Sequence, residues 1–140
     1  MTSTPIRAIL ITAGITTTIT LDPERTGRSI AQTIGCDTFD VVGLKDDIDV
    51  YVDDEGAING SPLNLALTIV AHRLGTPAVL FGSGVLVSTD DEGDTISLTG
   101  TQQETVLTAL RDKPDPATID RLCESLAPLP SVVALLRAIG

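Results

Sequence analysis

Carboxylates are the most conspicuous reactive groups of this 140-residue sequence, and they gather in two runs. The first extends from Asp37 to Glu55 and is relieved only by Lys45, and the second is Asp90-Asp91-Glu92-Gly93-Asp94. Carboxylate oxygens bind hard cations, and paired carboxylates catalyse glycoside hydrolysis. Neither run matches a calcium-binding loop, and a sugar cleft needs aromatic platforms where this chain has only Phe39, Tyr51 and Phe81.

Two interpretations of the acidic runs therefore stay open. In the first they are solvated hairpin tips that prevent edge pairing and keep the protein soluble. In the second they dock on a basic surface of another protein, in the strongest form by imitating DNA phosphates. The candidate partner-binding residues are Asp46, Asp47, Asp53, Asp54, Glu55, Asp90, Asp91, Glu92 and Asp94.

Other catalytic constellations are not supported. The single histidine, His72, falls on a polar line with Asn64 and Thr68 of an expected helix, where it is either solvated or placed at the helix C-terminus. The segment Gly82-Ser83-Gly84 resembles a nucleophile elbow, but Phe81 stands where that pattern needs glycine, and a bulge or tight turn is the alternative. We expect no catalytic residue.

Metal and cofactor sites are not predicted either. Cys36 and Cys123 lie far apart, and with one histidine they cannot supply the ligands of a zinc site. We interpret both as small apolar fillers, with a single disulfide as the alternative. Glycine-rich phosphate loops are missing from the sequence.

Composition limits the class of partner. The chain is 42% hydrophobic, which is typical of a folded domain, and its nine Lys and Arg against nineteen Asp and Glu give a net charge of −10. This charge opposes binding to nucleic acid or to an anionic membrane, which leaves a neutral or basic partner or no charged partner at all. Of these we predict a protein with a basic surface. No apolar run would cross a bilayer and the first residues lack a signal-peptide layout, so we expect a cytoplasmic protein.

The elements expected around these residues alternate between hairpins and helices. Strands are predicted at 6–12 and 15–21, 39–44 and 49–52, 79–87 and 95–98, with a short one at 57–58. Helices are predicted to follow caps at Asp22, Ser61 and Thr101 and to end near Gly35, Gly75 and Pro114. A divergent ββα repeat would explain the even spacing of the caps, and chance recurrence of a common motif is the alternative.

The remaining residues have helical patterns. A helix starts at Asp115-Pro116, and a second one from Ser131 is apolar on more than one face. The second helix either packs under the domain or forms a homodimer contact, for which the candidates are Val132, Leu135, Leu136 and Ile139. We predict one α+β domain, with a core at 1–113 and a helical pair at 114–140. Its mainly antiparallel sheet is built from hairpins, with helices on one face.

Four short motifs stand out together: IGCDTFDVV at 34–42, DVYVDDEG at 49–56, PLNLA at 62–66 and GVLV at 84–87. They resemble a family of small proteins of unknown function encoded by actinobacteria, their plasmids and their phages, and the resemblance covers about residues 6–99. It implies an accessory role and no catalytic residues. Within these motifs we expect Gly56 to need a positive φ and Asn64 to bond the loop that enters its helix.

The predicted function is therefore that of a non-enzymatic acidic accessory protein that binds a partner protein through its hairpin tips. The alternative is a module for a small ligand or divalent cation, in a cleft between the acidic turns and the helix with Asn64 and His72. An enzyme is the third hypothesis.

Overall fold

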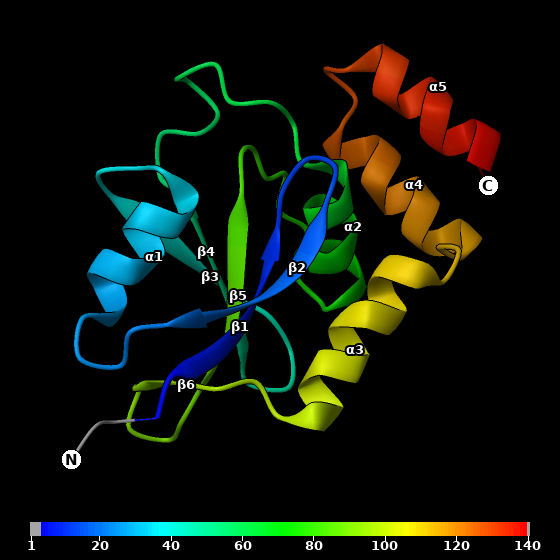
Figure 1. The fold of residues 1–140 in the computed structure, drawn as a ribbon. Helices are drawn as coiled ribbons and strands as arrows, with labels where there is room; N and C mark the ends of the chain where they lie inside the picture. The colour runs from blue at the N-terminus through cyan, green and yellow to red at the C-terminus, as the bar shows by residue number, and fades with distance from the viewer. Residues whose placement is uncertain (1–3, 140) are drawn as a thin grey trace.

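The computed structural model describes residues 4–139, without the side chain of Ile139, so that predicted homodimer contact lies outside the description. A six-stranded sheet forms the centre of the molecule (Figure 1). Its strands are β1 (Ile6–Ile11), β2 (Thr16–Leu21), β3 (Phe39–Gly43), β4 (Ile48–Asp53), β5 (Gly84–Thr89) and β6 (Thr95–Ile96). They run in the order β2-β1-β5-β4-β3, with β6 beside β5 and every pair antiparallel.

Alternation of side chains divides the core between the two faces of this sheet. In β5, Leu86 packs with Ile9 and Val50 on one face, whereas Val85 and Val87 pack on the other. Because both faces bury apolar residues, β5 reads as a continuous apolar run, as a strand covered on both sides does. The predicted α+β class, with an antiparallel sheet and a C-terminal helical pair, is confirmed.

The helices lie on both faces, so the prediction that they share one face is wrong. Helix α1 (Thr26–Ile34) covers one face through Ile30, and α2 (Leu65–Arg73) and α3 (Gly100–Arg111) cover the other (Figure 1). The physical reason is that β1 and β5 are apolar on both sides, and one layer of helices would leave Val85 and Val87 in water. The element order is nonetheless ββα three times over.

The predicted helix ends near Gly35 and Gly75 are confirmed, whereas the helices start later or earlier than the sequence patterns predict. Helix α1 begins at Thr26 without a side-chain cap, while the Asp22 carboxylate accepts the amide of Glu24 in a turn. The caps of the next two helices are Asn64 and Thr99 instead of Ser61 and Thr101. Each predicted cap has a rival Ser, Thr, Asp or Asn within a few residues, and contacts distant in sequence select among them.

Two glycines are explained by close packing. A Cβ on Gly84 would collide with the Leu67 side chain, so this glycine lets α2 approach β5. A Cβ on Gly56 would lie 2.9 Å from the carbonyl oxygen of Phe81, and Gly56 does not have a positive φ, so the predicted reason for that glycine is wrong. The short strand expected at 57–58 is also absent, because residues 54–60 form turns.

The last two helices pack on α2. Helices α4 (Pro116–Ser125) and α5 (Pro130–Ile139) enclose a small apolar cluster that includes Leu122, Leu126 and Leu136, with Leu65 and Ile69 of α2 at its border. As predicted, Asp115 caps α4, and Pro116 occupies its first turn. The domain boundaries remain a prediction. None of the described helices is both long and apolar enough to span a membrane.

Candidate functional site

The nine candidate acidic residues fall into two groups at opposite ends of β4. The turn between β3 and β4 holds Asp46 and Asp47, and residues 53–55 follow the other end of β4, about 17 Å away at the usual strand rise. The β5–β6 turn joins the first group, because the amide of Thr89 donates to the Asp47 carbonyl oxygen at 3.0 Å. We call this group the acidic end, and its members are Asp46, Asp47, Asp49, Asp90, Asp91, Glu92 and Asp94.

Backbone and side-chain contacts hold both turns of the acidic end in place. Asp46 and Asp47 adopt left-handed φ angles of 61° and 60°, which Asp tolerates better than most residues. Gln102 of α3 fastens this turn, since its Nε2 donates to the Asp46 carbonyl oxygen and to Ser88 Oγ, at 2.8 Å each. The acidic end is thus tied to the sheet and to α3.

The carboxylates of the acidic end differ in their freedom to meet a partner. Asp90 Oδ1 accepts the amides of Glu92 and Asp94 at 2.9 Å each, so this carboxylate builds its own turn. Asp49 accepts a hydrogen bond from Thr89 Oγ1. The exposed side chains are those of Asp46, Asp47, Asp91, Glu92 and Asp94.

The second acidic group, Asp53, Asp54 and Glu55, is bound into its own loop. Asp53 accepts the Glu55 amide at 2.9 Å and Asn59 Nδ2 at 2.8 Å, and Asp54 accepts Thr38 Oγ1 at 2.7 Å. A cavity of about 300 Å³ lies beside it, bordered by Asp53, Ser61 and Ser83. No residue of α2 lines this cavity, so it is not the cleft between the acidic turns and the helix with Asn64 and His72 that the small-ligand hypothesis expects.

The negative charges of this second group affect the pKa of a neighbouring thiol, that of Cys36. Partial burial raises the pKa of the Cys36 thiol above its ordinary 9.0, and the negative charges of Asp53, Asp54 and Asp37 raise it further. A thiol held in its neutral form is a poor nucleophile. Both cysteines are free, so neither forms the alternative disulfide.

The polar line of α2 faces the protein interior. Asn64, Thr68 and His72 are all buried, so the expectation that His72 is solvated is wrong. The alternative expectation, that His72 lies in the last turn of its helix, is confirmed. His72 Nδ1 bonds the Thr68 carbonyl oxygen at 2.9 Å and Nε2 lies 3.0 Å from Ser125 Oγ, which links α2 to α4. The helix with Asn64 and His72 therefore does not present these groups to a cleft.

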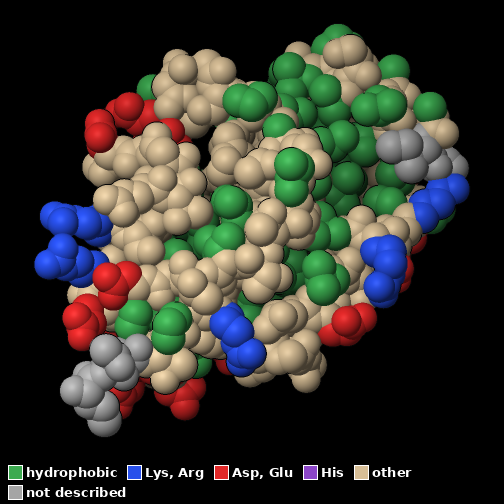
Figure 2. All heavy atoms as spheres, viewed as in Figure 1, with side chains coloured by type: hydrophobic (Ala, Val, Ile, Leu, Met, Phe, Trp, Pro, Cys, Tyr) green, Lys and Arg blue, Asp and Glu red, His purple; other side chains and the backbone are tan. Residues whose placement is uncertain are grey.

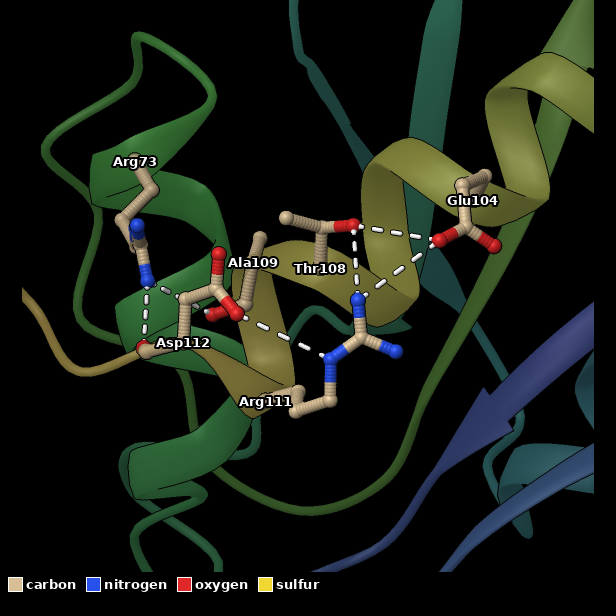
Figure 3. Close-up of polar contacts among 6 residues, drawn as sticks. All are labelled: Arg73, Glu104, Thr108, Ala109, Arg111 and Asp112. Atoms are coloured by element: carbon tan, nitrogen blue, oxygen red, sulfur yellow. Dashed lines mark hydrogen bonds and ion pairs between the residues drawn. The ribbon is translucent and has the colours of Figure 1, made fainter.

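A larger cavity lies between α2 and α3 and contains positive charge. It measures about 610 Å³ and is lined by Lys45, Arg73, Leu74, Gly100, Thr101, Glu104, Thr105, Thr108 and Ala109. Arg73 reaches from α2 toward the end of α3, where it donates to the Asp112 carbonyl oxygen at 2.6 Å and to that of Ala109 at 3.3 Å (Figure 3). The guanidinium thus supports helix packing.

Neighbouring charges reduce the capacity of this cavity to hold an anion. Arg111 lies 3.6 Å from Glu104 and 3.7 Å from Asp112, and these ion pairs are exposed (Figure 3). Glu104 itself lines the cavity, so its carboxylate opposes an anion near Lys45. Among the described residues no group of three or more His, Cys, Asp or Glu side chains could hold a metal ion.

Sequence reasoning missed Gln102 and Thr99. Together they form a capping box: Gln102 Oε1 accepts the Thr99 amide at 2.9 Å, and Thr99 Oγ1 accepts the Gln102 amide at 3.1 Å. The Thr-x-x-Gln spacing of residues 99–102 could have predicted this capping box. The overlapping Thr101-x-x-Glu104 has the same spacing, so the sequence alone does not choose between them.

The predicted homodimer contacts of α5 differ in exposure. Leu136 is only 1% exposed because it packs among Ile119, Leu122 and Leu126 of the same chain, and so it is not available to a second molecule. Val132 is partly buried against the same cluster, whereas Leu135 is exposed.

Comparison with known proteins identifies one family. The model of the family described as Domain of unknown function (DUF3846) matches residues 6–111, from β1 to the end of α3. This match confirms the predicted resemblance to a family of unknown function and leaves α4 and α5 outside it. No curated protein and no solved structure matches the chain.

Proposed function

We propose that this chain, which belongs to the DUF3846 family, is a non-enzymatic protein whose acidic end binds a partner protein with a basic surface. The observation that carries the proposal is the convergence of the β3–β4 and β5–β6 turns, which are distant in sequence, at one end of the sheet. The exposed carboxylates of Asp46, Asp47, Asp91, Glu92 and Asp94 gather there.

Electrostatics supports binding to a basic surface. Several like charges at one end of a molecule attract an oppositely charged partner, raise its association rate and exclude acidic competitors. The net charge of −10 adds to this attraction over distances of about a Debye length, ~8 Å at physiological salt. The anchoring of both turns means that little conformational entropy is lost when the partner binds.

The alternatives have less support. A cation site is disfavoured because the carboxylates of Asp53 and Asp90, which would be its ligands, already accept hydrogen bonds from their own loops. For an enzyme, His72 is buried and both of its ring nitrogens have partners within the chain.

The biological setting is part of the proposal. The resemblance to proteins of actinobacteria and their mobile elements favours an accessory role, in which a phage- or plasmid-encoded protein binds a host protein. We place this interaction in the cytoplasm, and a DNA-binding or defence protein of the host would have the required basic surface.

Three bait proteins test the proposal in a pull-down from a host lysate. They are the unchanged chain, a variant of the acidic end (Asp91→Asn, Glu92→Gln, Asp94→Asn), and a control with the same change in charge at the other end (Asp37→Asn, Asp54→Asn, Glu55→Gln). We expect a basic protein to be retained by the unchanged chain and the control and lost from the acidic-end variant. If no captured protein distinguishes the two variants, the acidic end is not the binding surface.

A further inference from the structure

Strand β2 forms an edge of the sheet, and its outer backbone groups have no partner among the described residues. The Thr12 amide donates to the Ile15 carbonyl oxygen at 2.9 Å, which closes the β1–β2 hairpin and sets the pattern of the ladder. Since alternate residues of an antiparallel strand bond the same neighbour, Thr16, Thr18 and Thr20 direct their amide and carbonyl groups away from β1. These groups form an open row.

The opposite edge strand, β3, is also largely exposed, but two of its outward backbone groups have partners within the chain. There the outward amide of Val41 donates to the Asp40 carboxylate at 3.0 Å, and the outward carbonyl oxygen of Gly43 accepts Thr76 Oγ1 at 2.6 Å. Asp40 also adds a charge to this edge. Proteins commonly protect edge strands with charges, proline, bulges or covering segments, and β2 has none of these.

We propose that β2 pairs with β2 of a second copy of this chain in an antiparallel dimer. The two-fold axis passes through Thr18, so the outward amide and carbonyl groups of Thr18 bond those of Thr18 in the second copy. Thr16 of each copy bonds Thr20 of the other in the same way. Each of these residues offers one donor and one acceptor, so the row is complementary to itself. The sheet then continues through both molecules, as in other cases of strand addition.

The charge pattern favours a second copy over a charged partner. From Ile15 to Leu21 the chain carries no ionisable side chain. In the view that looks onto β2, the middle of the surface is uncharged or apolar, and the red and blue side chains lie around it (Figure 2). Two molecules of net charge −10 meet with least repulsion on such a face.

The apolar residues of the hairpin fit the same register. Ile15 is 67% exposed and lies on the same side of the strand as Ile19 and Leu21. In the proposed register Ile15 stands opposite Leu21 of the second copy, and Ile19 opposite Thr17. Cross-strand pairs of this kind stabilise a sheet, and an exposed apolar side chain is withdrawn from water.

This interface is separate from the acidic end, so the two proposals can fail independently. Salt distinguishes them: the dimer should become tighter as salt screens the repulsion between two acidic molecules, whereas binding to a basic partner should become weaker.

Sedimentation velocity of the full chain tests the dimer, from about 1 to 100 μM, a range that covers micromolar association. We expect the unchanged chain to be dimeric at the upper end and Thr18→Lys, which sets two ammonium groups across the axis, to have half that mass. The controls are Val41→Lys on the other edge strand and Leu135→Lys on α5, and both should remain dimeric. Circular dichroism checks that each variant is folded.

Amide hydrogen exchange gives a second measurement that does not depend on a variant. In the dimer the amides of Thr16, Thr18 and Thr20 exchange more slowly as concentration rises, because they bond the second copy. The inference is overturned if the unchanged chain is monomeric at every concentration, if folded Thr18→Lys remains dimeric, if either control dissociates the dimer, or if these amides exchange equally fast at all concentrations.

Discussion

The buried side chain of His72 shows how a residue that suggests catalysis serves the fold. Both ring nitrogens bond groups of the same chain, one on α2 and one on α4. The sequence predicted that Asn64, Thr68 and His72 share one line of a helix, and they do. It could not predict that this line faces inward, because α2 is apolar almost all round and its periodicity selects no buried side.

The thiol of Cys36 tests the separation of the acidic groups. Asp54→Asn removes one of the negative charges that raise the pKa of this thiol, so the pKa moves down toward its ordinary value and more thiolate forms at a given pH below it. We expect faster reaction of Cys36 with a thiol reagent at about pH 8, where the thiolate is the nucleophile. Mass spectrometry of the labelled peptide separates Cys36 from the buried Cys123.

The matched control is Asp91→Asn at the acidic end. Because this residue lies beyond the far end of β4, the reaction rate of Cys36 should stay as in the unchanged chain. An equal acceleration by both substitutions would mean that the two acidic groups are not separate.

At the scale of elements, the first hairpin was predicted more accurately than the starts of the helices. The β1–β2 hairpin follows from an apolar run, a Gly-containing turn and strict alternation, all of which are local. The start of α2 depends instead on Asn64, whose Nδ2 donates to the carbonyl oxygens of Ile11 and Gly82 at 2.9 and 2.8 Å. These partners are distant in sequence, so the rival cap at Ser61 looked equivalent.

Replacement of this cap should destabilise the whole domain. Asn64→Ala removes the acceptor for the Leu67 amide and leaves one buried carbonyl oxygen, that of Ile11, and one partly buried carbonyl oxygen, that of Gly82, without this donor. At about 1–3 kcal/mol for an unsatisfied buried group, partly relieved by relaxation, we expect the free energy of unfolding to fall by roughly 2–4 kcal/mol. Urea unfolding measures this loss.

The exposed residue Asn59 supplies the comparison. Its side chain bonds Asp53 and Ser61 at the surface, so Asn59→Ala should cost less than about 1 kcal/mol. Equal losses in the two variants would show that Asn64 does not join α2 to β1 and to the loop before β5.

For the whole molecule, the class of partner inferred from composition remains a prediction, whereas the topology of the sheet shows how the candidate residues are divided. Asp46, Asp47, Asp53 and Asp54 belong to one acidic run of the sequence, and only the passage of β4 through the sheet separates the first two from the last two. The pairing of β4 with β5 then brings the second run to the first group. Long-range pairing of this kind has no local signal, and so the composition of the acidic end could not be derived from spacing.

The affinity for the captured partner as a function of salt tests the central claim most directly. Titration calorimetry between about 50 and 300 mM salt, which spans the change from weak to strong screening, should show the Kd of the unchanged chain rising steeply. The acidic-end variant should bind more weakly at low salt and respond less to salt, and the control at the other end should behave like the unchanged chain. A Kd that does not change with salt, or a salt response equal in all three proteins, would contradict binding through the acidic end.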